Sequence, residues 1–240
     1  MKKRVAALFL ATVMAVSVTA CGSTPEQTAP AEGNEAADSG DEAAAESDGG
    51  AASTGEKVLS VQIGPNPETL DPALNSAVDG GNMILHTFEC LLTVDQEGKL
   101  APGQAESWEV SDDGLTWTFH LRDGLKWSDG SDLTANDFVY SWKRVCDPEV
   151  AAPYAETVLG MVEGYDKAIE GELDALQVKA EDDKTLVVTL SSPCTYFGSL
   201  AAFATLSPVQ EATIEANGDG WATSAETYIS NGSFYVSEWV

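Results

Sequence analysis

The alternation of apolar and polar side chains over residues 115–122 constrains the fold more than any other feature of this chain. The segment reads LTWTFHLR, and successive side chains of a β-strand point to opposite faces. The pattern therefore predicts a half-buried strand with His120 on its polar face. No nucleophile or carboxylate accompanies His120 at the spacing of a catalytic motif, so we interpret it as part of a strand surface. The expected apolar face is Leu115, Trp117, Phe119 and Leu121.

A turn and a helix follow this strand directly. Asp129 and Gly130, within WSDGS, supply the backbone freedom that a tight reversal needs. Thr134 and Asp137 stand at the spacing of a capping box, in which two side chains satisfy free amides at the start of a helix. We expect every charge of residues 117–145 to cap, turn or face solvent, so this stretch is interpreted as scaffold. The expected buried stripe of the helix is Phe138, Val139, Trp142, Val145 and Cys146.

The remaining segments complete the prediction of a mixed α/β fold. Residues 57–64 and 231–240 have strand patterns, residues 175–190 read as a hairpin, and residues 82–94 and 209–221 read as helices. No segment repeats, which excludes a solenoid. The side chains expected to be buried include Ile84, Phe88, Leu91 and Leu92 in the first helix and Phe234, Val236 and Trp239 in the last strand.

The amino terminus has the parts of an export signal. Basic residues at 2–4 precede an apolar core at 5–18, and the sequence Val-Thr-Ala-Cys that ends at Cys21 resembles a bacterial lipobox. We therefore expect residues 1–20 to be a signal peptide. Cys21 is then the lipid anchor that holds the mature chain to the outer side of the bacterial cell membrane. An ordinary secretory signal with an incidental cysteine is the alternative.

Residues 21–56 are predicted to be an acidic, disordered tether. They are rich in Ala, Gly, Ser, Glu and Asp and contain no aromatic residue, Lys or Arg, so they cannot bury enough apolar surface to offset the entropy of ordering them. The whole sequence carries a formal charge of −27. Nucleic-acid binding needs basic patches, so this charge argues against a nucleic-acid partner.

The inventory of metal-binding and catalytic residues is small. Past Cys21 only Cys90, Cys146 and Cys194 remain, so at most one disulfide could form, and three buried thiols are the simpler interpretation. His86 and Cys90 lie four residues apart, but a metal site needs further ligands that the sequence does not offer. There are two histidines and no GxSxG, P-loop, HExxH or GxGxxG motif. We expect no enzyme activity, no metal and no cofactor.

Four motifs stand in an order that is known from one protein family. They are ETLDP, the block PGQAESWEVSDDGLTWTFHLRDGLKWSDGSDLTANDFVYSWKRV, DDKTLVVTLSSP and NGSFYVSEW. Through them the chain resembles the family 5 solute-binding proteins of ABC importers, which include oligopeptide-, dipeptide-, nickel- and haem-related members. The resemblance covers residues 57–240. It implies the type II (cluster C) fold of periplasmic binding proteins.

The resemblance also implies a division of the chain. Residues 57–87 would begin a first lobe, residues 88–206 would form an inserted subdomain, and residues 207–240 would return to the first lobe. Family members are much longer and enclose the ligand between two lobes. The sequence therefore looks like an N-terminal fragment whose second lobe is missing.

Four ligand-binding residues follow from the resemblance. In peptide-binding members the loop before the Leu-Asp-Pro motif lies along the ligand backbone, which corresponds to Pro65, Asn66 and Pro67. A Pro-Tyr-Ala segment supplies a tyrosine, here Tyr154. The two prolines depart from the family pattern, because they lack the amide that would donate to a peptide carbonyl. A packing role in a loop is the equal alternative for Tyr154.

The function that the resemblance implies is capture of oligopeptides or dipeptides outside the cell and their delivery to the permease subunits of an ABC importer. The protein would be a lipid-anchored monomer that works by hinge closure and not by catalysis. Another solute of the family (nickel, haem or a sugar-like ligand) and a peptide-sensing surface receptor are alternatives. An extracellular hydrolase is the alternative from a different class, and the sequence offers no nucleophile and base for it.

Overall fold

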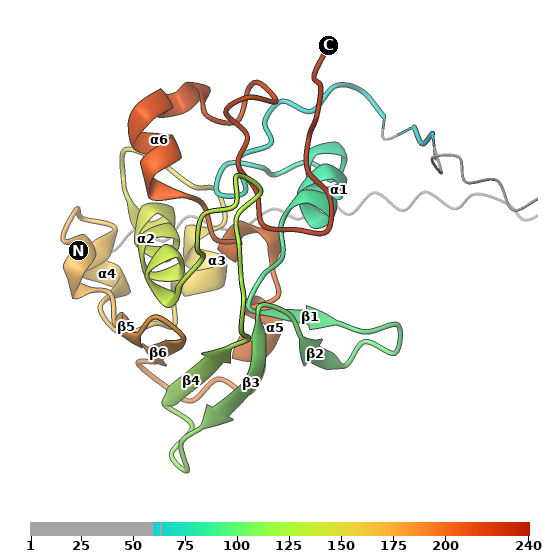
Figure 1. Cartoon of the computed structure of the whole chain (residues 1–240). Coiled ribbons are helices and arrows are strands. Elements are labelled where there is room, and N and C mark those ends of the chain that lie inside the picture. Colours follow the sequence, from blue (N-terminus) through green and yellow to red (C-terminus); the bar gives the residue numbers. More distant parts are fainter. Residues whose placement is uncertain (1–59, 63) are drawn as a thin grey trace, which may run out of the picture. The chain divides into compact units, whose positions relative to one another are not determined.

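A four-stranded antiparallel sheet organises the part of the chain that the structure describes (Figure 1). This computed structural model describes residues 60–62 and 64–240. The sheet has the strand order β3-β4-β6-β5, and β1 and β2 pair in a second, two-stranded sheet. The strands are β1 (Leu92–Val94), β2 (Leu100–Pro102), β3 (Ala105–Val110), β4 (Thr116–Leu121), β5 (Val178–Asp182) and β6 (Thr185–Thr189).

Helices lie around this sheet, and the mixed α/β class is therefore confirmed. The helix α2 packs against β5 and β6, while α5 packs against β1. The α-helices are α1 (Val78–Thr87), α2 (Ala135–Cys146), α3 (Ala155–Leu159), α4 (Tyr165–Ala168), α5 (Phe197–Leu200) and α6 (Glu211–Asn217). The short 3-10 helices are η1 (Leu173–Ala175), η2 (Ala204–Leu206) and η3 (Gly218–Gly220).

The central strand β4 confirms the alternation that the sequence predicts. Trp117, Phe119 and Leu121 are buried, whereas the side chains between them are half-exposed. The ring of Trp117 packs edge-on against Phe197 of α5, with 5.4 Å between the ring centroids. Aromatic pairs in this arrangement add to the stabilisation that burial alone supplies. The apolar face of the sheet thus forms the core, and His120 stays on the opposite face.

The predicted start of α2 is also confirmed. The hydroxyl of Thr134 accepts from the amide of Asn136 at 3.3 Å, and the carboxylate of Asp137 accepts from the amide of Thr134 at 2.7 Å. These contacts satisfy amides that have no partner within the first turn of a helix. Phe138, Trp142, Val145 and Cys146 are buried as expected, and Val139 is half-buried.

The helix expected over residues 82–94 is shorter and lies earlier in the chain. It spans Val78–Thr87, and Phe88 has the extended backbone of a strand, with φ −121° and ψ 157°. The cause is a contact with a distant segment. The amide of Gly232 donates to the carbonyl of Thr87 at 2.7 Å, and the helix ends at this residue. Ile84, Phe88, Leu91 and Leu92 are all buried. The apolar pattern predicted burial correctly and helix length incorrectly.

The strand predicted over residues 231–240 does not form. The segment makes two backbone hydrogen bonds to the end of α1, from Gly232 to Thr87 and from Phe234 to His86, and it has no strand partner among residues 60–62 and 64–240. A strand needs such a partner for its amides and carbonyls. Phe234 is therefore 62% exposed instead of buried. Residues 60–62 of the other expected strand are likewise not in a strand, and residues 57–59 and 63 lie outside the described residues.

Two arginines contradict the expectation that the charges of residues 117–145 only cap, turn or face solvent. The first, Arg144 of α2, reaches Asp71 of the Leu-Asp-Pro motif, with nitrogen–oxygen distances of 3.1 and 2.6 Å. Asp71 is 3% exposed, and it also accepts from Nε1 of Trp221 at 3.2 Å and from the amide of Ala73 at 2.9 Å. This buried ion pair joins three segments that are far apart in the sequence.

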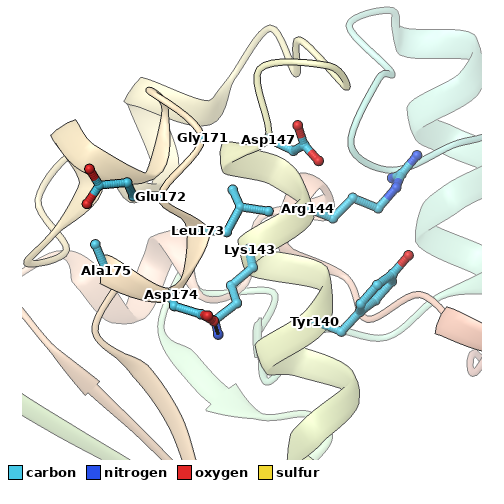
Figure 2. Close-up of a pocket in the computed structure, with 9 residues that line it drawn as sticks. All are labelled: Tyr140, Lys143, Arg144, Asp147, Gly171, Glu172, Leu173, Asp174 and Ala175. Carbon is cyan, nitrogen blue, oxygen red and sulfur yellow. Dashed lines mark hydrogen bonds and ion pairs between the residues drawn. The ribbon is translucent and has the colours of Figure 1, made fainter.

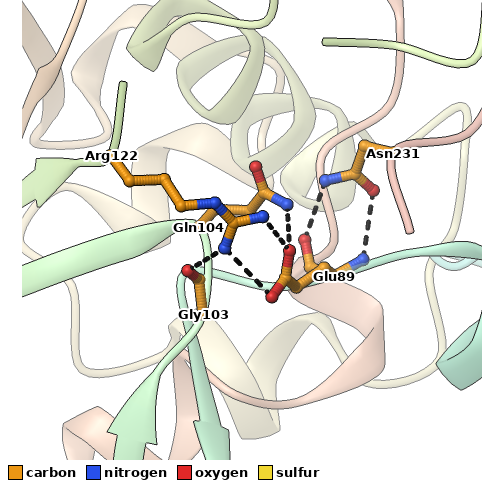
Figure 3. Close-up of polar contacts among 5 residues, drawn as sticks. All are labelled: Glu89, Gly103, Gln104, Arg122 and Asn231. Carbon is orange, nitrogen blue, oxygen red and sulfur yellow. Dashed lines mark hydrogen bonds and ion pairs between the residues drawn. The ribbon is translucent and has the colours of Figure 1, made fainter. Parts of the chain in front are cut away.

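The second arginine belongs to a polar cluster that Figure 3 shows. Arg122 donates to both carboxylate oxygens of Glu89, at 3.2 and 2.7 Å, and to the carbonyl of Gly103. Gln104 donates to the same carboxylate. The side-chain amide of Asn231 pairs with the backbone of Glu89 as a strand would, donating at 2.9 Å and accepting at 3.1 Å. The cluster links the C-terminal segment, through Asn231, to Glu89, which lies just before β1.

Candidate functional site

A cavity of about 210 Å³ opens at the N-terminal end of α1, and we call it the α1 cavity. Three parts of the chain surround it: the loop after the Leu-Asp-Pro motif with the first turn of α1, the residue before α3, and the segment around η2. Its lining residues are Pro72, Asn75, Ser76, Ala77, Val78, Gly81, Tyr154, Phe203, Ala204 and Thr205.

Asp71 and Asn75 give the loop of this cavity its shape. The carbonyl of Asp71 accepts from the amide of Asn75 at 2.9 Å, and the side-chain amide of Asn75 donates to the carbonyl of Ala77 at 3.0 Å. Gly80 lets the loop lie close to the helix, because a Cβ there would collide with the Asn75 side chain and come within 2.7 Å of the Thr69 carbonyl. The first turn of α1 therefore has to contain a glycine at this position.

Two aromatic rings form the opposite wall. Tyr154 and Phe203 meet edge to face, with 5.5 Å between their centroids and an interplanar angle of 70°. Tyr154 is half-buried, and Phe203 is 41% exposed. The backbone of Phe203 is fixed, because its carbonyl accepts from the amide of Leu206 at 2.8 Å and from the thiol of Cys90 at 3.4 Å. Tyr154 thus both packs against a neighbour and lines a cavity.

Among the residues that the structure describes, no charged side chain lines the α1 cavity. The acidic groups that are nearest in the sequence already have partners: Asp71 is paired with Arg144, and Asp79 accepts from the amide of Gly80 at 2.9 Å. The chemistry of the cavity is therefore that of aromatic and aliphatic surfaces with a few neutral polar groups. Such a surface suits uncharged parts of a ligand.

The structure separates the expected ligand-binding residues into two groups. Tyr154 lines the α1 cavity, whereas Pro65, Asn66 and Pro67 do not. Pro65 and Asn66 are exposed and Pro67 is half-buried. Their loop still passes near the start of α1, since a Cβ on Gly64 would lie 4.0 Å from that of Asp79. Cys21, the expected lipid anchor, lies outside the described residues.

Sequence reasoning missed the larger part of this site. The residues it did not single out are Asn75 to Val78, on the far side of the Leu-Asp-Pro motif, and Phe203 to Thr205. The stretch NSAVDGG, in which small residues and two glycines begin a helix, could have indicated this part of the site. Glycine in a first turn often marks a close approach of another segment. No sequence signal pairs Phe203 with Tyr154.

A larger groove, of about 690 Å³, lies between α2 and η1 (Figure 2). Its basic groups are already neutralised within the protein: Lys143 pairs with Asp174 at 2.6 Å, and Arg144 pairs with Asp71. None of the four expected ligand-binding residues lines it. The α1 cavity is therefore the better candidate, since it contains one of them.

The described residues contain no group of three or more His, Cys, Asp or Glu side chains that could hold a metal. The imidazole of His86 lies 2.7 Å from the Asn82 carbonyl, and the Cys90 thiol lies 3.3 Å from the Ser207 hydroxyl. Burial raises the pKa of the Cys90 thiol to about 11, so it stays protonated at neutral pH. Cys90, Cys146 and Cys194 are all buried and unpaired. Nor is any described helix of the length and apolarity that a membrane span requires.

Known proteins are similar to this chain in sequence and in fold. The chain is 44% identical over 180 residues to the periplasmic oligopeptide-binding protein OppA of Escherichia coli, and 41% identical over 178 residues to the probable deoxycholate-binding periplasmic protein YgiS of the same organism. These matches cover 74% and 73% of this chain and 33% of each relative. The chain thus spans about a third of the length of the curated relatives it matches.

The crystal structure of Haemophilus influenzae OppA in complex with RPPGFSPFR has a TM-score of 0.70 to this structure and is 40% identical in sequence, over 74% of this chain and 35% of that one. The expected periplasmic-binding-protein fold is confirmed as a partial lobe. A model of the family described as bacterial extracellular solute-binding proteins, family 5 Middle, matches residues 99–240, more than half of the chain. This protein belongs to family 5 of the bacterial extracellular solute-binding proteins.

Proposed function

We propose that this chain forms one wall of a peptide-binding site, in a solute-binding protein that captures oligopeptides or dipeptides outside the cell and delivers them to the permease of an ABC importer. Binding would proceed by closure around the ligand, without a catalytic step. As part of the same proposal, residues 57–87 and 207–240 form a first lobe, and residues 88–206 form a subdomain inserted into it. A lipid anchor at Cys21 would hold the protein, as a monomer, to the membrane.

The observation that carries this proposal is the α1 cavity. It brings Tyr154 together with the loop that follows the Leu-Asp-Pro motif and with an exposed aromatic ring at Phe203. Its volume of about 210 Å³ is below the range of roughly 300–1,000 Å³ that holds a complete small-molecule ligand. The cavity therefore fits one part of a longer ligand, such as one residue of a peptide, whose remainder lies outside it.

Two relatives support a peptide ligand by name, and one supports another chemistry. OppA of Escherichia coli is an oligopeptide-binding protein, and the Haemophilus influenzae structure holds RPPGFSPFR, whereas YgiS is a probable deoxycholate-binding protein. The uncharged lining of the α1 cavity is compatible with both kinds of ligand. Deoxycholate is therefore the second candidate, and it belongs in the same assay.

Calorimetric titration with peptides of two to five residues tests the proposal, on the longest form that the gene encodes. We expect binding of peptides, and we expect Tyr154→Ala to weaken it by about tenfold, because truncating a central aromatic contact costs more than about 1 kcal/mol. The matched control is Tyr196→Ala, since Tyr196 is 59% exposed and does not line the α1 cavity. Binding of deoxycholate but of no peptide would overturn the peptide proposal. Equal losses in the two variants would overturn the role of Tyr154.

The lipid anchor makes a separate prediction. Cys21→Ser removes the thiol that would carry the diacylglyceryl group, so the variant should lose the lipid modification and either enter the medium or stay as the uncut precursor. Two acyl chains bind a membrane durably, which makes the change easy to detect. Fractionation of cells and metabolic labelling with a fatty acid measure it. A mature, membrane-bound Cys21→Ser protein would contradict the anchor.

A further inference from the structure

The groove between α2 and η1 is a second place where a ligand can bind, separate from the α1 cavity. The two share no lining residue. The groove has a volume of about 690 Å³, which lies within the range of roughly 300–1,000 Å³ that holds a complete small molecule. One wall is the face of α2 that carries Tyr140 and Asp147, and the other is the turn at residues 171–175 (Figure 2).

The charges of this groove leave two carboxylates without a basic partner. The basic side chains that line it, Lys143 and Arg144, are already paired with acidic side chains of the protein. Asp147 and Glu172 also line the groove, and neither forms an ion pair within the described part of the chain. Since Asp147 directly follows the last residue of α2, the partial negative charge of the helix end adds to its own. The groove therefore attracts cations.

The lining between the two carboxylates is apolar. Figure 2 shows Leu173 between Asp147 and Glu172, and Leu173 is half-buried. The ring of Tyr140 is half-buried as well, and an aromatic ring attracts an ammonium group to its face. An alkyl chain that lay along Leu173 would be removed from water, which favours binding. The groove thus combines surfaces for a charged group and for hydrocarbon.

From these observations we infer that the groove between α2 and η1 binds a small organic dication, in which an alkyl chain carries an ammonium group at each end. One ammonium group pairs with Asp147 and the other with Glu172, while the chain lies on Leu173. Two charges are needed because two carboxylates of the lining lack a partner. This activity goes beyond the proposed function and does not depend on it.

The test is calorimetric titration of 1,4-diaminobutane into the longest form that the gene encodes. We expect binding of the diamine, no binding of the uncharged butane-1,4-diol, and at least threefold weaker binding of butylamine, which has one charge. Asp147→Asn should weaken the diamine about tenfold, because a half-buried charged contact is lost. Asparagine keeps an oxygen that can accept from the amide of Glu149, as Asp147 does at 2.9 Å. Glu172→Gln should weaken the diamine about threefold, because Glu172 is exposed.

Two variants are controls. Glu181→Gln removes the same charge from an exposed position outside the groove, and Tyr154→Ala alters the α1 cavity. Both should leave the affinity for the diamine unchanged. Equal weakening by Glu181→Gln and Asp147→Asn would show attraction to the acidic surface in general and overturn the inference. A loss in Tyr154→Ala would place the diamine in the α1 cavity, and equal affinities for butylamine and the diamine would exclude a dication site. Either result, or failure of the diamine to bind, would overturn the inference and leave the proposed function standing.

Discussion

Replacing Arg144 by alanine should lower the free energy of unfolding by about 3–5 kcal/mol. The guanidinium of Arg144 is the charged partner of Asp71, whose side chain is 4% exposed, and it donates to both carboxylate oxygens of that residue. Without it a carboxylate stays buried with only the neutral donors Trp221 and Ala73. Urea denaturation followed by far-UV circular dichroism measures the change.

The adjacent residue supplies a matched control for this prediction. Lys143 lies on the same helix and also forms an ion pair, but its partner Asp174 is 99% exposed. Lys143→Ala should therefore cost no more than about 1 kcal/mol. Equal losses of unfolding free energy in Lys143→Ala and Arg144→Ala would contradict the prediction that the buried Asp71–Arg144 pair stabilises the fold more than the exposed pair does.

A double-mutant cycle separates the ion pair from the packing of the arginine stem. Asp71→Ala alone should be about as destabilising as Arg144→Ala, since each leaves one buried charge without its partner. The double variant should lose clearly less than the sum of the two single losses, because neither charge remains. Additive losses would contradict direct coupling. Since Asp71 precedes Pro72 of the α1 cavity, the coupling also determines how firmly that wall is held.

The parts of the fold that the sequence predicts well are those in which local chemistry decides the conformation. The strand β4 alternates over Thr116–Leu121, and the start of α2 follows from Thr134 and Asp137, so each element is specified by residues within a few positions of one another. The hairpin of β5 and β6 is similar, since its strands are neighbours in the sequence and pair directly.

The parts that the sequence misses depend on contacts between distant segments. The helix α1 ends at Thr87 because Gly232 bonds to its carbonyl across the fold, and no pattern within residues 82–94 contains that information. The same holds for Arg122 and Arg144, whose partners lie elsewhere in the chain. A charge that looks solvent-exposed in a helical or strand pattern can instead form an ion pair with a distant segment, and in the case of Arg144 that pair is buried.

The candidate site illustrates the same limit. Tyr154 could be singled out because a short motif accompanies it, but its neighbour Phe203 stands in an apolar stretch with no distinguishing feature. The loop from Asn75 to Val78 follows the Leu-Asp-Pro motif directly, yet only the structure shows that it faces the two rings. Three separate segments form the α1 cavity together. The sequence pattern of any one of them does not predict it.

The other large effect is expected at Trp142, which is fully buried at the centre of α2. Trp142→Ala should cost about 3–5 kcal/mol, because it leaves a cavity that the core cannot refill completely. Trp142→Phe keeps much of the volume but removes the indole N–H, which donates to the carbonyl of Leu206 at 3.1 Å. A buried acceptor without its donor costs about 1–3 kcal/mol, so the phenylalanine variant should show an intermediate loss.

Trp239→Ala is the control for this series, since Trp239 is 40% exposed and its loss should cost about 1 kcal/mol or less. Thermal and urea unfolding monitored by far-UV circular dichroism avoid the change in fluorescence that removing a tryptophan causes. If Trp142→Phe were as stable as the parent, the bond to Leu206 would contribute nothing and Trp142 would act only by filling space. The bond matters for the candidate site because Leu206 ends the 3-10 helix whose Ala204 and Thr205 line the α1 cavity.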